Sequence, residues 1–315
     1  MDTKVFIDGE AGTTGLQILD RLSGRDDIEL LHLGDDRRKD ADARAEMLNY
    51  ADVSVLCLPE NASREAVAML ENPQARVIDA SIAYRTAADW VYGFPEYRLG
   101  QRDEIAAARL VSNPGCYACA SVSMLHPLVA AGLLPAEFPA TINAVSGYTG
   151  GGKSLIAAFE DPSAENYTDS AFYLYALGMA HKHVPEIQQR GSITNPPVFV
   201  PSVGGFAQGM IVSLPLQLWA LPKSPKPADL YAALADHYAG QRFVSVAPLS
   251  DPEVIAHLDP EALNNTNDLK LYVFGNEDTE QAVVCAVLDN LGKGASGQAV
   301  QNLNLMLGVD EAIGL

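Results

Sequence analysis

The stretch Lys4-Val5-Phe6-Ile7-Asp8-Gly9-Glu10-Ala11-Gly12-Thr13-Thr14-Gly15 decides the fold of the first part of this chain. The run up to Asp8 predicts a short buried strand, and residues 16–22 carry apolar side chains at helical spacing. A strand, a glycine-rich turn and a helix in this order present backbone N–H groups to a pyrophosphate, although such glycines can also be purely structural. The candidate cofactor-binding residues of the turn are Gly9, Gly12, Thr13, Thr14 and Gly15.

The alternation of apolar strands and helices continues along the chain. Further strands are expected at residues 28–33, 53–59, 76–81 and 110–112, with helical segments between them. Such alternation predicts a doubly wound, mainly parallel sheet of the Rossmann type. Ligands bind outside the carboxyl ends of these strands, so we expect Ser81, which follows the fourth strand, to lie near the bound molecules.

Three consecutive cations, Arg37, Arg38 and Lys39, follow the second strand. A dinucleotide-binding domain reads the adenosine ribose near this point, and cations there suit a 2′-phosphate. The sequence therefore favours NADP(H) over NAD. Two alternatives stay open: a solvated charged loop, or a ribose hydroxyl bound by Asp35 or Asp36.

A second stretch, Ser112-Asn113-Pro114-Gly115-Cys116-Tyr117, precedes a long run of small and apolar residues. Asparagine and proline are favoured at the start of a helix, so Cys116 is expected in a first helical turn. The positive end of the helix dipole stabilises a thiolate there. We interpret Cys116 as a nucleophile; the alternative is a cysteine that packs as a small apolar residue.

After this helix the pattern changes to alternating apolar runs at residues 198–220 and 270–289. They predict an α+β second domain with a mainly antiparallel sheet. Gly147, Gly152, Lys153 and Ser154 satisfy the spacing of a phosphate-binding Walker loop. Because the first turn already supplies a dinucleotide site, we interpret this loop as lying near the substrate instead.

The segment His181-Lys182-His183 concentrates two of the 6 histidines of the chain. No metal ligands stand nearby, so a general acid or base is the better interpretation, with the choice between His181 and His183 open. Lys182 can hold an anionic group. Arg85 suits phosphate or carboxylate, unless it is an ordinary surface arginine. The candidate substrate-binding residues are Ser81, Arg85, Asn113, Lys182 and Glu186.

Composition limits the class of partner. The formal net charge of −19 argues against nucleic acid and anionic membranes as partners. The four cysteines, Cys57, Cys116, Cys119 and Cys285, form no disulfide framework in a chain of 315 residues. With neither a signal-peptide layout nor an apolar run of membrane-spanning length, the sequence predicts a soluble, cytoplasmic protein.

Five motifs together resemble the shorter form of the N-acetyl-gamma-glutamyl-phosphate reductase family. They are the glycines at 9–15, Asn-Pro-Gly-Cys-Tyr at 113–117, Ser-Gly-Tyr-Thr-Gly-Gly-Gly-Lys at 146–153, His-Lys-His-Val-Pro-Glu-Ile at 181–187 and Lys-Gly-Ala-Ser-Gly-Gln-Ala-Val-Gln-Asn at 293–302.

This resemblance implies a fold like that of the glyceraldehyde-phosphate and aspartate-semialdehyde dehydrogenases, in a homodimer or homotetramer. Residues 1–115 and 290–315 would bind the dinucleotide, and residues 116–289 would form the catalytic and oligomerisation domain. The implied reaction is the NADPH-dependent reduction of an acyl phosphate through a Cys116 thioester in arginine biosynthesis. Gly294 and Asn302 would lie near the nicotinamide.

The chain departs from the family pattern at one place: the family usually has Pro-Thr after the Cys-Tyr pair, and here Ala118-Cys119 stand instead, which creates Cys116-Tyr117-Ala118-Cys119. A reversible disulfide is conceivable, and a packed small residue is the alternative. Two rival functions also remain. One is a sister reductase acting on an aminoadipate or aspartyl phosphate, and the other is a non-catalytic NADP-binding redox sensor.

Overall fold

The computed structural model describes residues 3–34, 36–249 and 255–315. Asp35, one of the two carboxylates considered for the ribose, lies outside these ranges. The chain divides into two compact units: Met1–Pro95, Leu99–Gly115 and Ala295–Leu315 form the first, and Glu96–Arg98 and Cys116–Gly294 form the second. The units differ from the expected domains at residues 96–98 and 290–294, which belong to the second unit.

The first unit is a doubly wound parallel sheet, as the sequence predicts. Its strands are β1 (Thr3–Asp8), β2 (Ile28–Leu31), β3 (Val53–Leu56), β4 (Arg76–Asp79), β5 (Val91–Tyr92) and β6 (Leu110–Ser112). They pair in the order β2-β1-β3-β4-β6-β5, and every pairing is parallel. The short edge strand β5 was not expected from the sequence.

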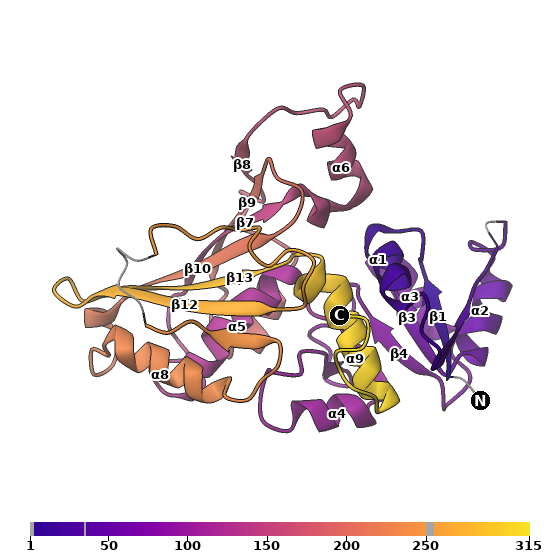
Figure 1. The fold of residues 1–315 in the computed structure, drawn as a ribbon, viewed down its shortest axis with the longest axis horizontal. Helices are drawn as coiled ribbons and strands as arrows, with labels where there is room; N and C mark the ends of the chain where they lie inside the picture. Colours follow the sequence, from indigo (N-terminus) through magenta and orange to yellow (C-terminus); the bar gives the residue numbers. More distant parts are fainter. Residues whose placement is uncertain (1–2, 35, 250–254) are drawn as a thin grey trace. The chain divides into compact units, whose positions relative to one another are not determined.

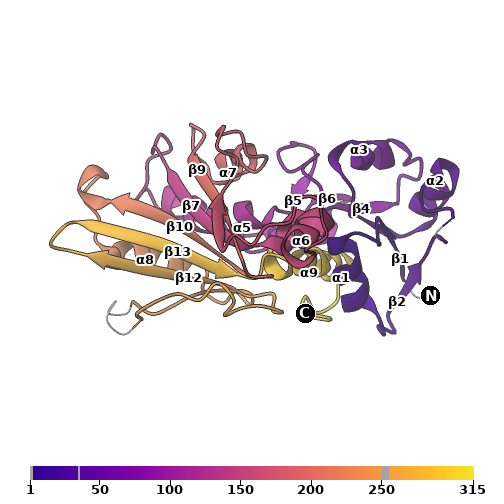
Figure 2. The ribbon, with the colours of Figure 1, turned by 90° about the horizontal axis from the view of Figure 1, so that it is seen from above.

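Helices cover both faces of this sheet: α1 (Thr13–Leu22), α2 (Ala41–Tyr50), α3 (Glu60–Ala68), α4 (Gln101–Ala107) and α9 (Gly297–Leu307). Successive side chains of a strand point to opposite faces. Val5 and Ile7 therefore pack with Ile18 of α1 and Val300 of α9. Phe6 joins the core on the other face, with residues of α2 and α3. Figure 2 shows α2 and α3 on the side of this sheet opposite α1 and α9. The last helix thus returns to the N-terminal sheet.

The second unit is built on one mixed sheet. Its strands are β7 (Thr141–Gly147), β8 (Phe172–Leu174), β9 (Val198–Gly204), β10 (Met210–Gln217), β11 (Val244–Val246), β12 (Leu269–Asn276) and β13 (Gln281–Leu288), in the order β11-β12-β13-β10-β7-β9-β8. Four pairings are antiparallel and two, β7 with β9 and β11 with β12, are parallel. The prediction of a mainly antiparallel sheet is confirmed.

Two helices pack against β10, β12 and β13: α5 (Cys116–Ala130) and α8 (Pro227–His237) (Figure 1). The remaining elements of the unit are α6 (Gly152–Glu160), α7 (Val184–Arg190), the short turns η1 (Tyr148–Gly151) and η2 (Leu218–Ala220), and the π-helical turn η3 (Gly292–Ser296), which continues into α9. Nearly all of α5 is buried, which explains why its sequence is apolar all round. None of the helices in the described part of the chain has the length and apolar character needed to span a bilayer.

Candidate active site

The glycine-rich turn after β1 folds tightly against the end of β3. Gly9 has φ +91°, and a Cβ on it would lie 2.5 Å from the carbonyl oxygen of Cys57. The amide of Gly12 donates to the carbonyl of Gly9 at 3.0 Å, and a Cβ on Gly15 would overlap that same oxygen. Because Gly12 caps α1 without a side chain, the first amides of the helix stay available to an anion. The turn fits a dinucleotide pyrophosphate, with Thr13 and Thr14 opening α1.

The cations after β2 lie in a tight, exposed turn. The amides of Arg37 and Arg38 both donate to the carbonyl of Gly34, at 2.8 and 3.0 Å. The guanidinium of Arg37 lies 3.8 Å from the carboxylate of Glu46, and these side chains are 55% and 66% exposed. This loose pair leaves Arg37 accessible to a phosphate.

Sequence reasoning missed a tighter pair beside this turn. Arg44 of α2 donates to the carboxylate of Asp8 at 2.8 Å; Asp8 is buried and the side chain of Arg44 is partly buried. Asp8 ends β1, directly before the glycine turn. The sequence signal was an aspartate at the end of a buried strand, because a buried carboxylate needs a charged or hydrogen-bonding partner.

Buried polar groups connect the ends of β4 and β6. The hydroxyls of Ser63 and Ser81 donate to the two carboxylate oxygens of Asp79, at 2.5 and 2.7 Å. Burial raises the pKa of Asp79, and these hydrogen bonds oppose that rise. The amide of Asn113 donates to the carbonyl of Asp79 at 2.8 Å. Ser81 therefore holds Asp79, which in turn fixes the loop that precedes Cys116 in the chain.

Arg85 belongs to this network rather than to an open crevice. Its guanidinium donates to the carbonyls of Ala80 and Asn113, each at 3.0 Å, and the residue is only 7% exposed. The planar fork of the side chain thus bridges the two loops. The alternative of an ordinary surface arginine is wrong, and its expected contact with substrate stays a prediction.

Asn302 meets Asn113 in the first unit. The Nδ2 group of Asn302 donates to the side-chain oxygen of Asn113 at 3.0 Å and to the carbonyl of Gly93 at 2.9 Å. The Oδ1 atom of Asn302 is buried and has no hydrogen-bond partner among the described residues. A buried acceptor without a donor is costly, so this atom suits an amide donor of a bound ligand.

In the second unit, Cys116 is the first residue of α5, which confirms its expected place in a first helical turn. Cys116 is partly exposed, and a Cβ on Gly294 would lie 2.7 Å from its Cβ atom. All four cysteines are thiols rather than disulfide partners. Burial raises the pKa of the Cys119 thiol well above its ordinary range, as expected for a packed small residue.

Both histidines lie against Tyr117, the residue that follows the nucleophile candidate. The ring centroids of His181 and His183 are 5.7 and 6.0 Å from that of Tyr117, and 4.9 Å from one another. Lys182 is exposed, and Glu186 is buried in the first turn of α7. Residues 181–183 form a turn that leads into α7.

The hydrogen bonds of His181 fix its neutral form. The amide of His183, which can only donate, lies 3.1 Å from Nδ1 of His181. Nδ1 is therefore an acceptor, and the proton of the neutral ring is on Nε2, 3.3 Å from the hydroxyl of Tyr175. Burial, together with the charge of Lys182, lowers the pKa of His181 to about 4. The ring is neutral at physiological pH and presents an N–H donor.

Sequence reasoning also missed the tyrosines of this cluster. Tyr117 donates to the carbonyl of Ser202 at 3.1 Å and its hydroxyl lies 2.8 Å from that of Ser146. Burial raises the pKa of Tyr175 to about 12, so its hydroxyl stays protonated. Tyr175 stands six residues before His181 in an apolar segment, and nothing local in the sequence distinguishes it from a core tyrosine.

Two family descriptions match most of the chain. Residues 4–108 match the NAD binding domain of semialdehyde dehydrogenases, and residues 116–290 match the dimerisation domain of the same family.

Full-length relatives are similar over the whole chain. An N-acetyl-gamma-glutamyl-phosphate reductase 2 from a Nostoc species is 53% identical and aligns with 99% of each chain. The N-acetyl-gamma-glutamyl-phosphate reductase of Brucella ovis is 52% identical over 98% of this chain and 100% of its own.

Solved structures share the fold at low sequence identity. Aspartate semialdehyde dehydrogenase II from Vibrio cholerae, complexed with ASA, has a TM-score of 0.69 at 14% identity and covers 98% of this chain and 99% of its own. The Candida albicans aspartate semialdehyde dehydrogenase with NADP has a TM-score of 0.64 at 14% identity, covering 99% and 100%. At these identities the likeness concerns the fold alone.

Proposed function

Because the chain belongs to the N-acetyl-gamma-glutamyl-phosphate reductase family, we propose that it reduces N-acetyl-L-glutamyl 5-phosphate with NADPH. The products are N-acetyl-L-glutamate 5-semialdehyde and phosphate, a step of arginine biosynthesis. The observation that carries this proposal is the partly exposed thiol of Cys116 at the start of α5, in a unit that also holds His181 beside Tyr117.

Cys116 is the nucleophile in this scheme. Its thiolate attacks the acyl carbonyl, the carbon–oxygen bond to phosphate breaks, and phosphate leaves with a proton from solvent to give a thioester. The first amides of α5 have no carbonyl partner within their own helix and can donate to the oxyanion. The bound NADPH supplies a hydride to the thioester carbonyl.

His181 stabilises the charge on the substrate oxygen in both steps. Its Nε2–H group donates to the oxyanion in place of the long 3.3 Å contact with Tyr175. When the thiohemiacetal oxyanion collapses, the carbon–sulfur bond breaks and the aldehyde leaves Cys116 as a thiolate. His183 is buried and positions His181 through its amide, so we assign the contact with the substrate oxygen to His181, as a hydrogen-bond donor to the oxyanion.

Single asparagine substitutions of the two histidines test this assignment. We expect His181→Asn to lower kcat by roughly 100-fold, because a positioned hydrogen-bond donor to an oxyanion contributes that much, and His183→Asn to lower it less. Equal, mild losses in both variants would contradict a direct role for either ring.

We assign the remaining predicted contacts as follows. Gly9, Gly12, Thr13, Thr14 and Gly15 hold the pyrophosphate of NADPH; Arg37 and Arg38 hold its 2′-phosphate; Gly294 and Asn302 serve the nicotinamide. Lys182 contacts the anionic substrate, because its side chain is exposed. Ser81, Arg85 and Asn113 are buried and position the loops that bear these contacts, and Glu186 is buried in the first turn of α7.

Cofactor choice can be tested by binding alone. In Arg37→Ala/Arg38→Ala we expect the Kd for NADPH, measured by nucleotide fluorescence, to rise roughly tenfold or more, because the charged contacts with the phosphate are lost. The Kd for NADH should not change. Arg109→Ala is the matched control, since this exposed arginine precedes β6 and lies at the opposite end of the parallel strands. Equal losses for both nucleotides would contradict the assignment.

The substrate is tested by the reverse reaction. We expect phosphate-dependent NADP⁺ reduction with N-acetylglutamate semialdehyde to exceed that with aspartate semialdehyde by roughly 100-fold in kcat/KM. A preference for aspartate semialdehyde, or for the aminoadipate analogue, would identify a sister acyl-phosphate reductase. NADP⁺ binding without any turnover would favour the redox-sensor alternative.

A homodimer fits the face of the second sheet that lies opposite α5 and α8. Side chains that pair directly across strands share a face, and five partly exposed apolar residues line this one. They are Val145, Ile211, Tyr272, Phe274 and Val283. A charged substitution, Ile211→Glu, is expected to give monomers in light-scattering chromatography; an unchanged mass would reject this face.

We place the enzyme in the cytoplasm, where its four thiols stay reduced.

A further inference from the structure

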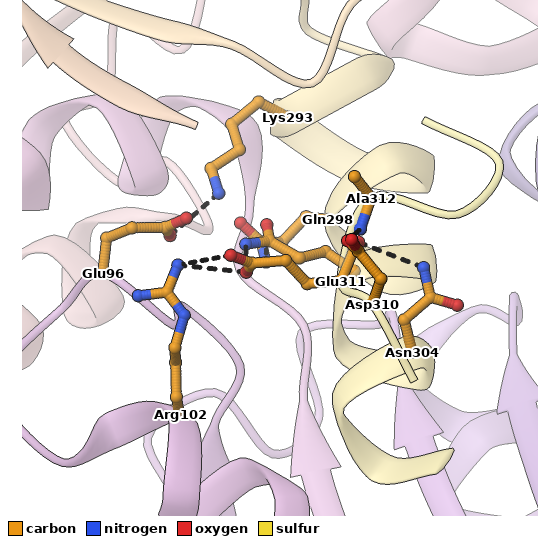
Figure 3. Close-up of polar contacts among 9 residues, drawn as sticks. Glu96, Arg102, Lys293, Gln298, Asn304, Asp310, Glu311 and Ala312 are labelled. Atoms are coloured by element: carbon orange, nitrogen blue, oxygen red, sulfur yellow. Dashed lines mark hydrogen bonds and ion pairs between the residues drawn. The ribbon is translucent and has the colours of Figure 1, made fainter. Parts of the chain in front are cut away.

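A buried ion pair of the second unit has no part in the scheme above. The ammonium of Lys293 donates to the carboxylate of Glu96 at 2.8 Å, and both side chains are 0% exposed (Figure 3). The same ammonium lies 5.6 Å from the ring centroid of Phe243. Desolvating two charges is expensive, and apolar residues of the same volume often stabilise a fold as well or better. Stability alone is therefore a poor reason for this pair.

The position of Lys293 in the chain suggests a different reason. Lys293 stands in η3 directly before Gly294, whose amide donates to the carbonyl of Asp289 at 2.9 Å. A Cβ on Gly294 would lie 2.7 Å from Cβ and 3.3 Å from Cα of Cys116. Glu96 thus anchors Lys293, and the next residue, Gly294, lies against Cys116 in the first turn of α5.

Both charges of the pair also act on Cys119, which lies one helical turn after Cys116. Burial raises the pKa of the Cys119 thiol, the charge of Lys293 lowers it, and the carboxylates of Glu96 and Glu186 oppose Lys293. Cys119 lies one helical turn from Cys116 on the same face of α5. The hydroxyls of Tyr117 and Tyr175 also interact electrostatically with Cys116.

We propose that Lys293 and Glu96 are a positioning pair for the reactive thiol. By anchoring residue 293, the pair holds Gly294 against Cys116 and fixes the first turn of α5, while Glu96 balances the buried ammonium. This inference rests on the proposed role of Cys116 as nucleophile.

The rate of Cys116 alkylation by iodoacetamide, measured from pH 5 to 10, tests the pair without any turnover. The Lys293→Met and Glu96→Gln single variants each leave one buried charge without its partner, so both should melt at lower temperature than the wild type. The double variant Lys293→Met/Glu96→Gln leaves no unpaired charge, so its melting temperature should return to that of the wild type. Peptide mass spectrometry assigns the label to Cys116, since burial raises the pKa of the other three thiols.

The double variant separates positioning from stability. We expect its alkylation rate at pH 7 to stay about tenfold below that of the wild type, because the turn is no longer anchored. Recovery of both the melting temperature and the wild-type pH profile would show that the pair only stabilises the fold, and would overturn the proposal.

Gly294→Ala keeps the proposal testable if the double variant does not fold. Its added methyl group pushes the turn away from Cys116 without removing either member of the ion pair, so the alkylation rate at pH 7 should again fall below that of the wild type. An unchanged alkylation rate in this variant would also overturn the proposal. Alkylation that responds as expected in an enzyme without reductase activity would reject the proposed function and leave the pair standing.

Discussion

Replacing Arg85 separates the two roles that the sequence and the structure suggest for it. In the structure the guanidinium donates to the carbonyls of Ala80 and Asn113, each at 3.0 Å, in a residue that is 7% exposed. Arg85→Ala leaves both carbonyls without this donor. A hydrogen bond from a charged donor contributes about 1.5 kcal/mol at the low end of the usual range, so the two together contribute about 3 kcal/mol.

A loss of that size is easy to measure by calorimetry. For a domain of this size, 1 kcal/mol corresponds to roughly 2–4 °C, so we expect the melting temperature of Arg85→Ala to fall by roughly 6–12 °C. Because the bridged loop leads into Cys116, kcat should fall while KM for the acyl phosphate changes little. The control is Arg109→Ala, which removes an exposed guanidinium that donates to the carbonyl of Ala75 and should cost less than about 0.5 kcal/mol.

The opposite result would refute this reasoning. If Arg85 held the substrate, Arg85→Ala would keep its melting temperature within a degree or so of the control, and KM for the acyl phosphate would rise instead.

Three further predictions concern the second unit. Because the pKa of His181 is lowered to about 4, its Nδ1 keeps accepting from the amide of His183 at mild acidity. Activity should fall only as pH falls through about 4, when protonation of Nδ1 ends the hydrogen bond that positions the ring; a limb near pH 6.5 that disappears in His181→Asn would contradict this. Tyr175→Phe removes the hydroxyl that orients Nε2 of His181 and should lower kcat roughly fivefold, corresponding to about 1 kcal/mol, with Tyr173→Phe as the unaffected control. Oxidised glutathione should give no disulfide between Cys116 and Cys119, because Cys119 is buried with a raised pKa; a loss of two mass units in the peptide that spans them would show otherwise.

Local features of the chain could be predicted from the sequence. The glycine turn at 9–15 and the start of α5 at Cys116 depend on residues that are neighbours in the chain, so capping and backbone rules suffice for both. The alternation of Val5, Phe6 and Ile7 between two cores follows from the pleat of a strand in the same way.

Contacts between distant residues could not be predicted. Lys293 and Glu96 are 197 residues apart, and neither lies in a sequence motif that identifies the other as its partner. Arg85 is similar, because its partner Asn113 offers only a backbone carbonyl, which every residue possesses.

The C-terminal segment shows the same limit within the first unit. The carboxylate of Glu311 accepts two hydrogen bonds from Arg102, at 2.8 and 3.0 Å, and Asn304 donates to the carbonyl of Glu311 at 3.0 Å (Figure 3). No sequence motif around Glu311 indicates that it will form these hydrogen bonds. These groups meet only through the packing of α4 and α9 in the folded unit.

Trapping the acyl-enzyme tests the central claim most directly. Mixing the enzyme with N-acetylglutamyl phosphate in the absence of NADPH, followed by an acid quench and intact-mass spectrometry, should show one N-acetylglutamyl group on Cys116, released by hydroxylamine. Cys116→Ser should form no such thioester and should have no reductase activity. Normal turnover in Cys116→Ser, or an acyl group on another residue of the wild type, would contradict the role of Cys116.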